Sequence, residues 1–309
     1  MGSLPFSSRA ARTVWRVAPK RAYSGAVGWG AGIGIPAWLR PTFLARFARL
    51  YGIEIAEAEH SLADYRTLDD FFTRRLRDGA RPVDPDTDAV VAPSDGTVIE
   101  SGLVTEGSLV QVKGVLFELE DLLGDAELAG RLEGGGFLTT YLSPRDYHRV
   151  HSPIEGSVVG WRYMPGKLYP VGASSVGREP GLFISNERLV TLIDGGRAGL
   201  CALVMVAAVG VGHITAAYDD TIATHLRSFK PGRGSQMRYE MPRPVSKGAE
   251  IGTFHLGSTT IAVFEPRRVA LETLAPGSVT RMGEAIGRIL PSGAGKPIAI
   301  GPGTMTETV

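Results

Sequence analysis

From about residue 83 to residue 290, short runs of apolar and β-branched residues alternate with turns rich in glycine, proline and aspartate. Runs of this kind, bounded by such turns, are typical of β-strands. The chain contains 40 glycines and 20 prolines, which fits a backbone that turns often. We therefore expect a mainly β domain, built as a sandwich or a flattened barrel. The runs that carry this prediction are 90–92, 97–99, 108–112, 137–141, 157–161 and 199–212.

The first 80 residues follow a different pattern, in which apolar residues recur at helical spacing. One helix is predicted around residues 43–50, and its arginines lie away from its apolar face. That face either packs on the protein core or lies in a membrane interface, and both can hold on different sides of the helix. The apolar face consists of Phe43, Leu44, Phe47 and Leu50.

A second helix is predicted to begin at Thr67, because a hydroxyl residue followed by acidic residues is a typical helix start. We expect Phe71, Phe72 and Leu76 to face inward, and Arg74, Arg75 and Arg77 to form a solvated face.

These patterns predict an α+β protein in three parts. Residues 1–80 form an N-terminal helical region that associates with a membrane, residues 81–290 form the β-rich domain, and residues 291–309 form a flexible tail. With 309 residues, 43% hydrophobic and 21% charged, the chain is long and apolar enough to bury a substantial core. Its single cysteine, Cys201, lies in an apolar run and is expected to be buried, in a reducing compartment.

Charge is distributed unevenly, although the net charge is only +1. Residues 1–50 carry eight basic residues, no acidic residue, and three of the four tryptophans. Basic residues draw a segment toward anionic lipid, and tryptophan favours the headgroup boundary. We therefore favour association with an anionic membrane surface over a loose basic arm or an Arg-rich targeting peptide.

No run reaches the ~18–20 apolar residues that a spanning helix needs. The N-terminus also lacks the compact apolar segment of a signal peptide. We expect a peripheral protein that lies on a membrane, and no nucleic-acid partner.

The segment Leu256–Gly257–Ser258–Thr259 lies between apolar, β-like runs. A glycine carbonyl is easily reached because the residue has no Cβ, and the Ser258 hydroxyl is the nearest nucleophile. Attack of that hydroxyl on the Gly257 carbonyl would convert the peptide bond into an ester. Elimination and hydrolysis would then leave a pyruvoyl group on the new N-terminus.

A serine hydroxyl needs a base, and two segments supply candidates. Asp95 lies in a Pro/Gly-rich turn, where the ordinary alternative is an aspartate bonded to its own backbone. His148 and His151 lie three residues apart in the segment 141–153. A histidine can take the serine proton near neutral pH, and a carboxylate can orient it. Two histidines at this spacing could also bind zinc, but no third ligand stands at a useful spacing, and we expect no metal.

Together with residues 247–252, which lead into the Gly-Ser-Thr segment, these motifs resemble those of bacterial-type phosphatidylserine decarboxylases. The resemblance runs from about Tyr23 to Pro266, with the motifs in the expected order. It implies that the β-rich domain is catalytic and that Asp95 and His151 assist self-cleavage at Ser258. It also implies that His148 serves the decarboxylation step as the acid that protonates the substrate carbon, while Tyr141 helps to position the substrate.

The same resemblance implies a pyruvoyl cofactor derived from Ser258, and decarboxylation of phosphatidylserine to phosphatidylethanolamine and CO2. The mature enzyme would pair chains 1–257 and 258–309 and associate further with copies of itself. Its expected location is the cytoplasmic face of the cell membrane, or alternatively the mitochondrial inner membrane. Two other hypotheses remain: a serine hydrolase that uses Asp95, His151 and Ser258, although Ser258 lacks a Gly-x-Ser-x-Gly elbow, and a non-enzymatic membrane module.

Overall fold

The computed structural model describes residues 30–112, 115–171, 181–208, 213–224, 235–255 and 258–291. Its centre is an antiparallel sheet of eight strands in the order β11-β7-β8-β9-β13-β5-β2-β15. In sheet order, the strands are β11 (Gln236–Val245), β7 (Gly156–Met164), β8 (Arg188–Asp194), β9 (Leu200–Ala207), β13 (Ser258–Phe264), β5 (Gly136–Leu142), β2 (Gly96–Leu103) and β15 (Val279–Thr280).

The central strands are buried on both faces, and alternate residues enter two different cores. In β13, Ile261 and Val263 pack on one side, whereas Ala262 and Phe264 pack on the other. This alternation follows from the period of two in a β-strand, and it explains why these strands are apolar at nearly every position. Cys201, in the neighbouring strand β9, is fully buried as expected.

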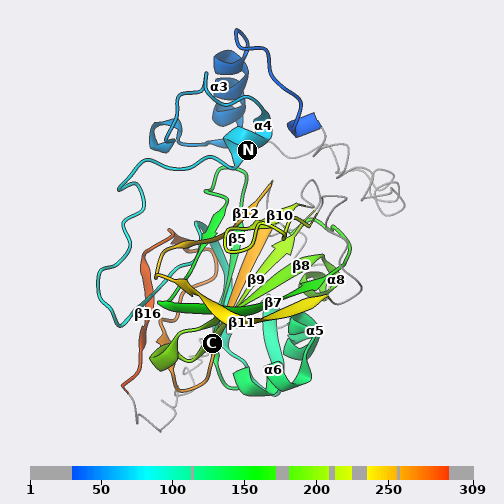
Figure 1. Ribbon diagram of the computed structural model, residues 1–309, viewed down its shortest axis with the longest axis vertical. Coiled ribbons are helices and arrows are strands. Elements are labelled where there is room, and N and C mark those ends of the chain that lie inside the picture. The colour runs from blue at the N-terminus through cyan, green and yellow to red at the C-terminus, as the bar shows by residue number, and fades with distance from the viewer. Residues whose placement is uncertain are drawn as a thin grey trace, which may run out of the picture.

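Short helices and a hairpin cover one face of the large sheet. They contribute leucines and phenylalanines to the core on this side. Figure 1 shows α5 and α6 together beside the sheet. The elements are β3 (Ser108–Val112), β4 (Val115–Glu118), α5 (Leu119–Leu123), α6 (Ala126–Leu132) and α8 (Leu182–Ser185).

Two three-stranded sheets supply the core residues that pack on the other face. The first has the order β1-β16-β14 and the second has the order β10-β12-β6. Their strands are β1 (Ala89–Val91), β16 (Ala285–Ile289), β14 (Val269–Leu271), β10 (Ile214–Ala216), β12 (Glu250–Phe254) and β6 (Arg149–His151), and the 3-10 turn η2 (Gly196–Ala198) joins β8 to β9.

The described part of the N-terminal region has a small core of its own. It contains α3 (Arg40–Tyr51), the 3-10 turn η1 (Ile55–Glu57) and α4 (Leu68–Phe72). In Figure 1, α3 and α4 lie at one end of the molecule, beyond β10 and β12. Leu44 and Ala48 of α3 are fully buried in this core, together with Phe71 of α4.

The predicted apolar face of α3 is divided in the structure. Leu44 faces the core and Phe47 packs against it, but Phe43 and Leu50 are exposed. The reason is geometric: successive residues of a helix are about 100° apart, so Phe43 and Leu44 point in different directions.

The predicted start of α4 is confirmed, because Thr67 and Asp70 form a reciprocal capping box. The helix ends at Phe72, however, and Leu76 instead forms a β-bridge with Ala58. Arg74 is also not on a solvated face, since only 4% of its surface is exposed.

The prediction of an α+β protein with a mainly β core is confirmed, and the large sheet is open. None of the helices in the described residues is both long and apolar enough to cross a membrane. The membrane role of the N-terminal region and the domain boundaries stay predictions. The tail from residue 292 lies outside the described residues.

Candidate active site

Ser258 is the first residue of β13, in the middle of the large sheet. It pairs with Leu142 at the end of β5 and with Ala207 at the end of β9. On the far side of β5, Thr97 of β2 pairs with Tyr141. Asp95, two residues before Thr97, therefore lies at the same end of the sheet as Ser258.

The Ser258 side chain belongs to the face covered by the two small sheets. Ala262 and Phe264, an even number of residues away along β13, pack on that face. The hydroxyl of Thr260, also in this row, hydrogen-bonds the Ser94 hydroxyl at 3.0 Å. Ser258 is fully buried, and its Oγ has no hydrogen-bond partner among the described residues. Leu256 and Gly257 lie outside these residues.

His151 ends the strand β6, which runs beside the segment that carries Asp95. The His151 N–H donates to the Pro93 carbonyl at 2.7 Å. Its Nδ1 donates to the Gly248 carbonyl at 2.8 Å, so Nε2 carries the lone pair and accepts from the Tyr147 hydroxyl at 3.3 Å. Burial lowers the pKa of His151. Its bond to Gly248 opposes that shift, as do the charge of Glu250 and, more weakly, that of Asp95. The imidazole is therefore neutral near pH 7.

His148 lies in the loop that joins β5 to β6 and is fully buried. Its Nδ1 donates to the Asp146 carbonyl at 2.8 Å, and its ring lies 4.1 Å from that of Phe72 in α4. Burial lowers the pKa of His148 to about 3, and the nearby Arg74 guanidinium acts in the same direction. Nε2 has no hydrogen-bond partner among the described residues, so it offers a free lone pair.

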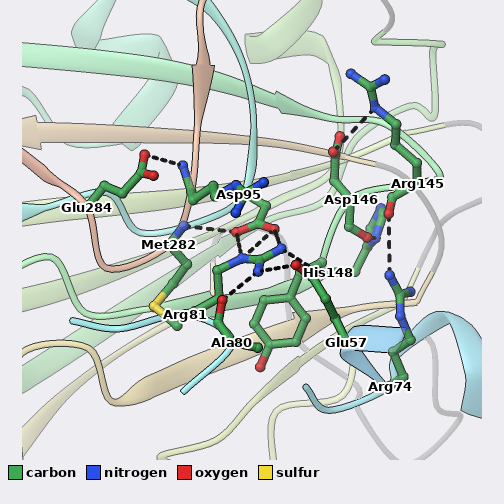
Figure 2. Close-up of polar contacts among 12 residues, drawn as sticks. Glu57, Arg74, Ala80, Arg81, Asp95, Arg145, Asp146, His148, Met282 and Glu284 are labelled. Atoms are coloured by element: carbon green, nitrogen blue, oxygen red, sulfur yellow. Dashed lines mark hydrogen bonds and ion pairs between the residues drawn. The ribbon is translucent and has the colours of Figure 1, made fainter. Parts of the chain in front are cut away.

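Asp95 is held by a guanidinium rather than by a histidine (Figure 2). Both of its carboxylate oxygens accept from Arg81, and Oδ1 also accepts from the Met282 N–H at 2.9 Å. No hydrogen bond joins Asp95 to His151, although both residues are described. Asp95 therefore influences His151 through its charge.

Tyr141 is not brought together with the other candidates. Its side chain packs against the core on the helix-covered face, whereas Leu142 packs on the face of Ser258. Burial raises the pKa of Tyr141. The structure thus gathers the segments of Asp95, His148, His151 and Ser258 at one end of the sheet.

Two further histidines lie near the start of β13. The rings of His213 and His255 stack at 4.0 Å, and His255 Nδ1 donates to Asp69 of α4 at 2.9 Å. Within the described ranges, no group of three or more His, Cys, Asp or Glu side chains is placed to hold a metal ion. His225 lies outside those ranges.

Sequence reasoning missed Arg81, Tyr147 and Gly248. Tyr147 stands inside the segment that supplied both histidines, and its position four residues before His151 was the only available signal. Nothing local distinguishes Arg81 from the other arginines of the region, because its two acidic partners are 24 and 14 residues away in the sequence.

Known proteins similar to this chain belong to the family that the sequence motifs resemble. A model of the phosphatidylserine decarboxylase family matches residues 68–288, which include all four candidate catalytic residues. A phosphatidylserine decarboxylase proenzyme of Anaeromyxobacter sp. is 47% identical over 274 residues, which cover 88% of this chain and 95% of that protein. The chain belongs to the phosphatidylserine decarboxylase family.

Other members of the phosphatidylserine decarboxylase family have similar sequence identities to this chain. The proenzyme of Myxococcus xanthus is 44% identical over 89% of this chain and 96% of its own length. The proenzyme of Pseudomonas aeruginosa (strain LESB58) is 41% identical over 81% of this chain and 86% of its own length. The similarity thus extends into the N-terminal region, beyond the part that the family model matches.

Proposed function

We propose that this chain is a phosphatidylserine decarboxylase proenzyme that cleaves itself between Gly257 and Ser258. The mature protein then converts phosphatidylserine to phosphatidylethanolamine and CO2. The observation that carries this proposal is the buried Ser258 hydroxyl, which has no hydrogen-bond partner among the described residues. It lies at the sheet end where the segments of Asp95, His148 and His151 meet. Family membership supports the substrate, because the relatives are named for it.

In self-cleavage, Ser258 Oγ attacks the Gly257 carbonyl carbon and loses its proton to a base. We assign that role to His151, which is neutral. Its Nε2 carries the lone pair that would take the proton in exchange for its 3.3 Å hydrogen bond with the Tyr147 hydroxyl, while Nδ1 stays bonded to the Gly248 carbonyl. The charge of Asp95 favours the imidazolium that forms. The peptide C–N bond breaks as the ester C–O bond forms. Elimination then breaks the Ser258 Cβ–Oγ bond, and hydrolysis releases ammonia.

Residue 258 is a suitable place for the pyruvoyl group. In the pyruvoyl group the serine Cα becomes the ketone carbon and Cβ becomes a methyl group, while Oγ leaves with Gly257. The loss of Oγ breaks no hydrogen bond to a described residue. A ketone next to an amide carbonyl supplies an electron sink for the electrons that remain when CO2 leaves.

His148 fits the proton transfers of turnover. It is neutral at pH 7, so it must take up a proton before it can donate one to the substrate carbon. The substrate ammonium is a source of that proton, because the amine must lose protons before it reacts with a ketone. The free Nε2 is the nitrogen that would accept and donate.

The proposed substrate is a lipid that stays in the bilayer, so the enzyme must work at a membrane surface. We propose peripheral association with the cytoplasmic face of the cell membrane, through the basic N-terminal region. The working enzyme would hold both of its chains, 1–257 and 258–309, and would associate further with copies of itself. A serine hydrolase would instead keep its peptide bond and its serine.

Denaturing mass spectrometry of the purified protein tests this function. We expect two chains, the smaller of which begins with a pyruvoyl group at position 258 and resists N-terminal sequencing. Ser258→Ala is expected to stay uncut and inactive. His151→Ala and Asp95→Asn should accumulate precursor, whereas His148→Ala should mature but decarboxylate at least about 100-fold more slowly.

One result would exclude the mechanism: a single full-length chain that is active on phosphatidylserine. If His148→Ala and His151→Ala show the same cleavage and the same kinetics, the division of roles between the two histidines is wrong.

A further inference from the structure

Arg81 joins the candidate Asp95 to the N-terminal region through a second carboxylate (Figure 2). Its Nη1 and Nη2 donate to the two oxygens of Glu57 at 3.0 and 2.9 Å. Its Nε donates to both oxygens of Asp95 at 2.9 Å, and Nη2 donates to Oδ2 at 2.6 Å. One guanidinium thus holds two carboxylates from different parts of the fold.

The shape of the guanidinium makes this a directional contact. Its donors lie in one plane, so two carboxylates bound along its edges have fixed orientations relative to each other. The Arg81 side chain is only 9% exposed, and that of Asp95 is 7% exposed. Without Arg81, the Met282 N–H would be the one donor left to the buried Asp95 carboxylate among the described residues. The carboxylate would then be held less firmly and could rotate away from its present orientation.

Position matters for Asp95 because it acts on His151 through space and not through a hydrogen bond. The effect of a charge at a distance depends on where the charge lies and on what neutralises it. Glu57, Arg81 and Asp95 together carry one net negative charge. Glu57 therefore offsets the charge of Arg81 and leaves that of Asp95 effective at His151.

We propose that Arg81 is a positioning residue for self-cleavage, that it fixes the Asp95 carboxylate, and that Glu57 fixes Arg81. This inference rests on the proposed function. It makes the N-terminal region part of the maturation site, since η1 supplies Glu57. Arg81 forms no hydrogen bond or ion pair with Ser258 or His151, which are both described, so we infer that it acts through Asp95.

The test follows the cleavage rate of freshly translated chains as a function of pH. We expect Arg81→Met to cleave at least about tenfold more slowly than the parent, a part of the 10²–10⁴-fold that a positioned base contributes. Arg81→Lys keeps the charge but not the planar fork, so it should recover only part of the rate. Arg162→Met is the matched control, because it breaks another partly buried ion pair, with Asp125, and should cleave like the parent.

A second variant separates positioning from folding. Glu57→Gln keeps the shape of its side chain, but it removes the charge that offsets Arg81. We expect the midpoint of the pH–rate profile to move to lower pH, because the imidazolium of His151 loses support. The other charges nearest His151, Glu250 and Arg149, pair with each other at 2.8 Å and are unchanged in all variants. A purely structural role would leave the midpoint in place.

Melting temperatures, measured in the uncut Ser258→Ala background, show whether each variant folds. The inference is overturned if folded Arg81→Met cleaves within about twofold of the parent, or if Glu57→Gln leaves the pH midpoint unchanged. If the parent itself stays uncut, the proposed function fails, and this inference fails with it. If the parent cleaves itself and the variants cleave as it does, this inference is wrong but the proposed function stands.

Discussion

At the scale of single residues, the two histidines differ in environment although they lie only three positions apart. His148 packs against Phe72, and one of its ring nitrogens has no hydrogen-bond partner in the part of the chain that the structure describes. His151 has partners on both ring nitrogens and lies close to the charge of Asp95. The difference supports separate roles, with His151 in maturation and His148 in turnover.

The buried His148 should make the precursor less stable in acid. Its pKa is near 6.5 when unfolded but about 3 when folded. Between these values the unfolded chain binds more protons, so the free energy of unfolding falls as pH falls. The slope from one proton is roughly 1.4 kcal/mol per pH unit. Urea unfolding of Ser258→Ala at pH 7, 6 and 5 should show this loss.

The control for this prediction is His148→Asn in the same uncut background. Its free energy of unfolding should depend less steeply on pH, since the asparagine does not titrate. His151 contributes in the same direction and is present in both proteins. Parallel pH curves for the two proteins would contradict the assignment of a buried, neutral His148.

At the scale of elements, α3 presents apolar side chains in two directions. Leu44 and Ala48 fill the small N-terminal core, whereas Phe43 and Leu50 point away from it. Trp38, just before the helix, is 81% exposed and Leu50 is 76% exposed. An exposed apolar group flanked by arginines is typical of a helix that rests on a lipid surface. Deleting residues up to 50 would also remove the buried side chains, so point substitutions are the better test.

We expect the triple substitution Trp38→Gln, Phe43→Gln and Leu50→Gln to weaken binding to anionic vesicles at both low and high salt. Arg46→Gln with Arg49→Gln should weaken it mainly at low salt, because salt screens the electrostatic part. Vesicle sedimentation measures both effects, and self-cleavage reports whether the proteins fold. Unchanged binding by the triple variant would show that this face is not the anchor.

At the scale of the whole molecule, the proposed cleavage point lies at the start of a central strand. β13 begins at Ser258, so a cut between Gly257 and Ser258 leaves its pairing with β5 and β9 in place. The piece 258–309 also supplies β15, which pairs with β2, and β16, which pairs with β1. Ile261, Val263 and Phe264 are fully buried, and each contributes about 1.5–3 kcal/mol to holding the pieces together.

The two chains of the mature protein should therefore co-elute in size-exclusion chromatography without denaturant, although no covalent bond joins them. They should separate only in urea or guanidinium, and the 52-residue chain should not refold alone. Phe264→Ala should lower the urea midpoint for dissociation, because it removes a large buried side chain. Release of the small chain under native conditions would contradict this arrangement.

The sequence by itself determined the features that depend on nearby residues. The alternation of apolar runs with turns predicted a mainly β core, and Thr67 predicted a helix start, since strand period and helix capping are local properties. The motifs at Asp95, His148, His151 and Ser258 were likewise readable, with the help of family resemblance. Tyr141 stood in the same motif, but pleating directs its side chain to the opposite face of the sheet.

Only the tertiary structure decided which distant groups meet. It placed Arg81 between Glu57 and Asp95, and it buried Arg74 beside the His148 loop. It also brought Nδ1 of His151 within hydrogen-bond distance of the Gly248 carbonyl. It also turned Phe43 outward and Leu44 inward on a helix whose sequence predicted both on one apolar face. These outcomes follow from how separate elements pack and from which charges must be paired once water is removed, and no local pattern records either.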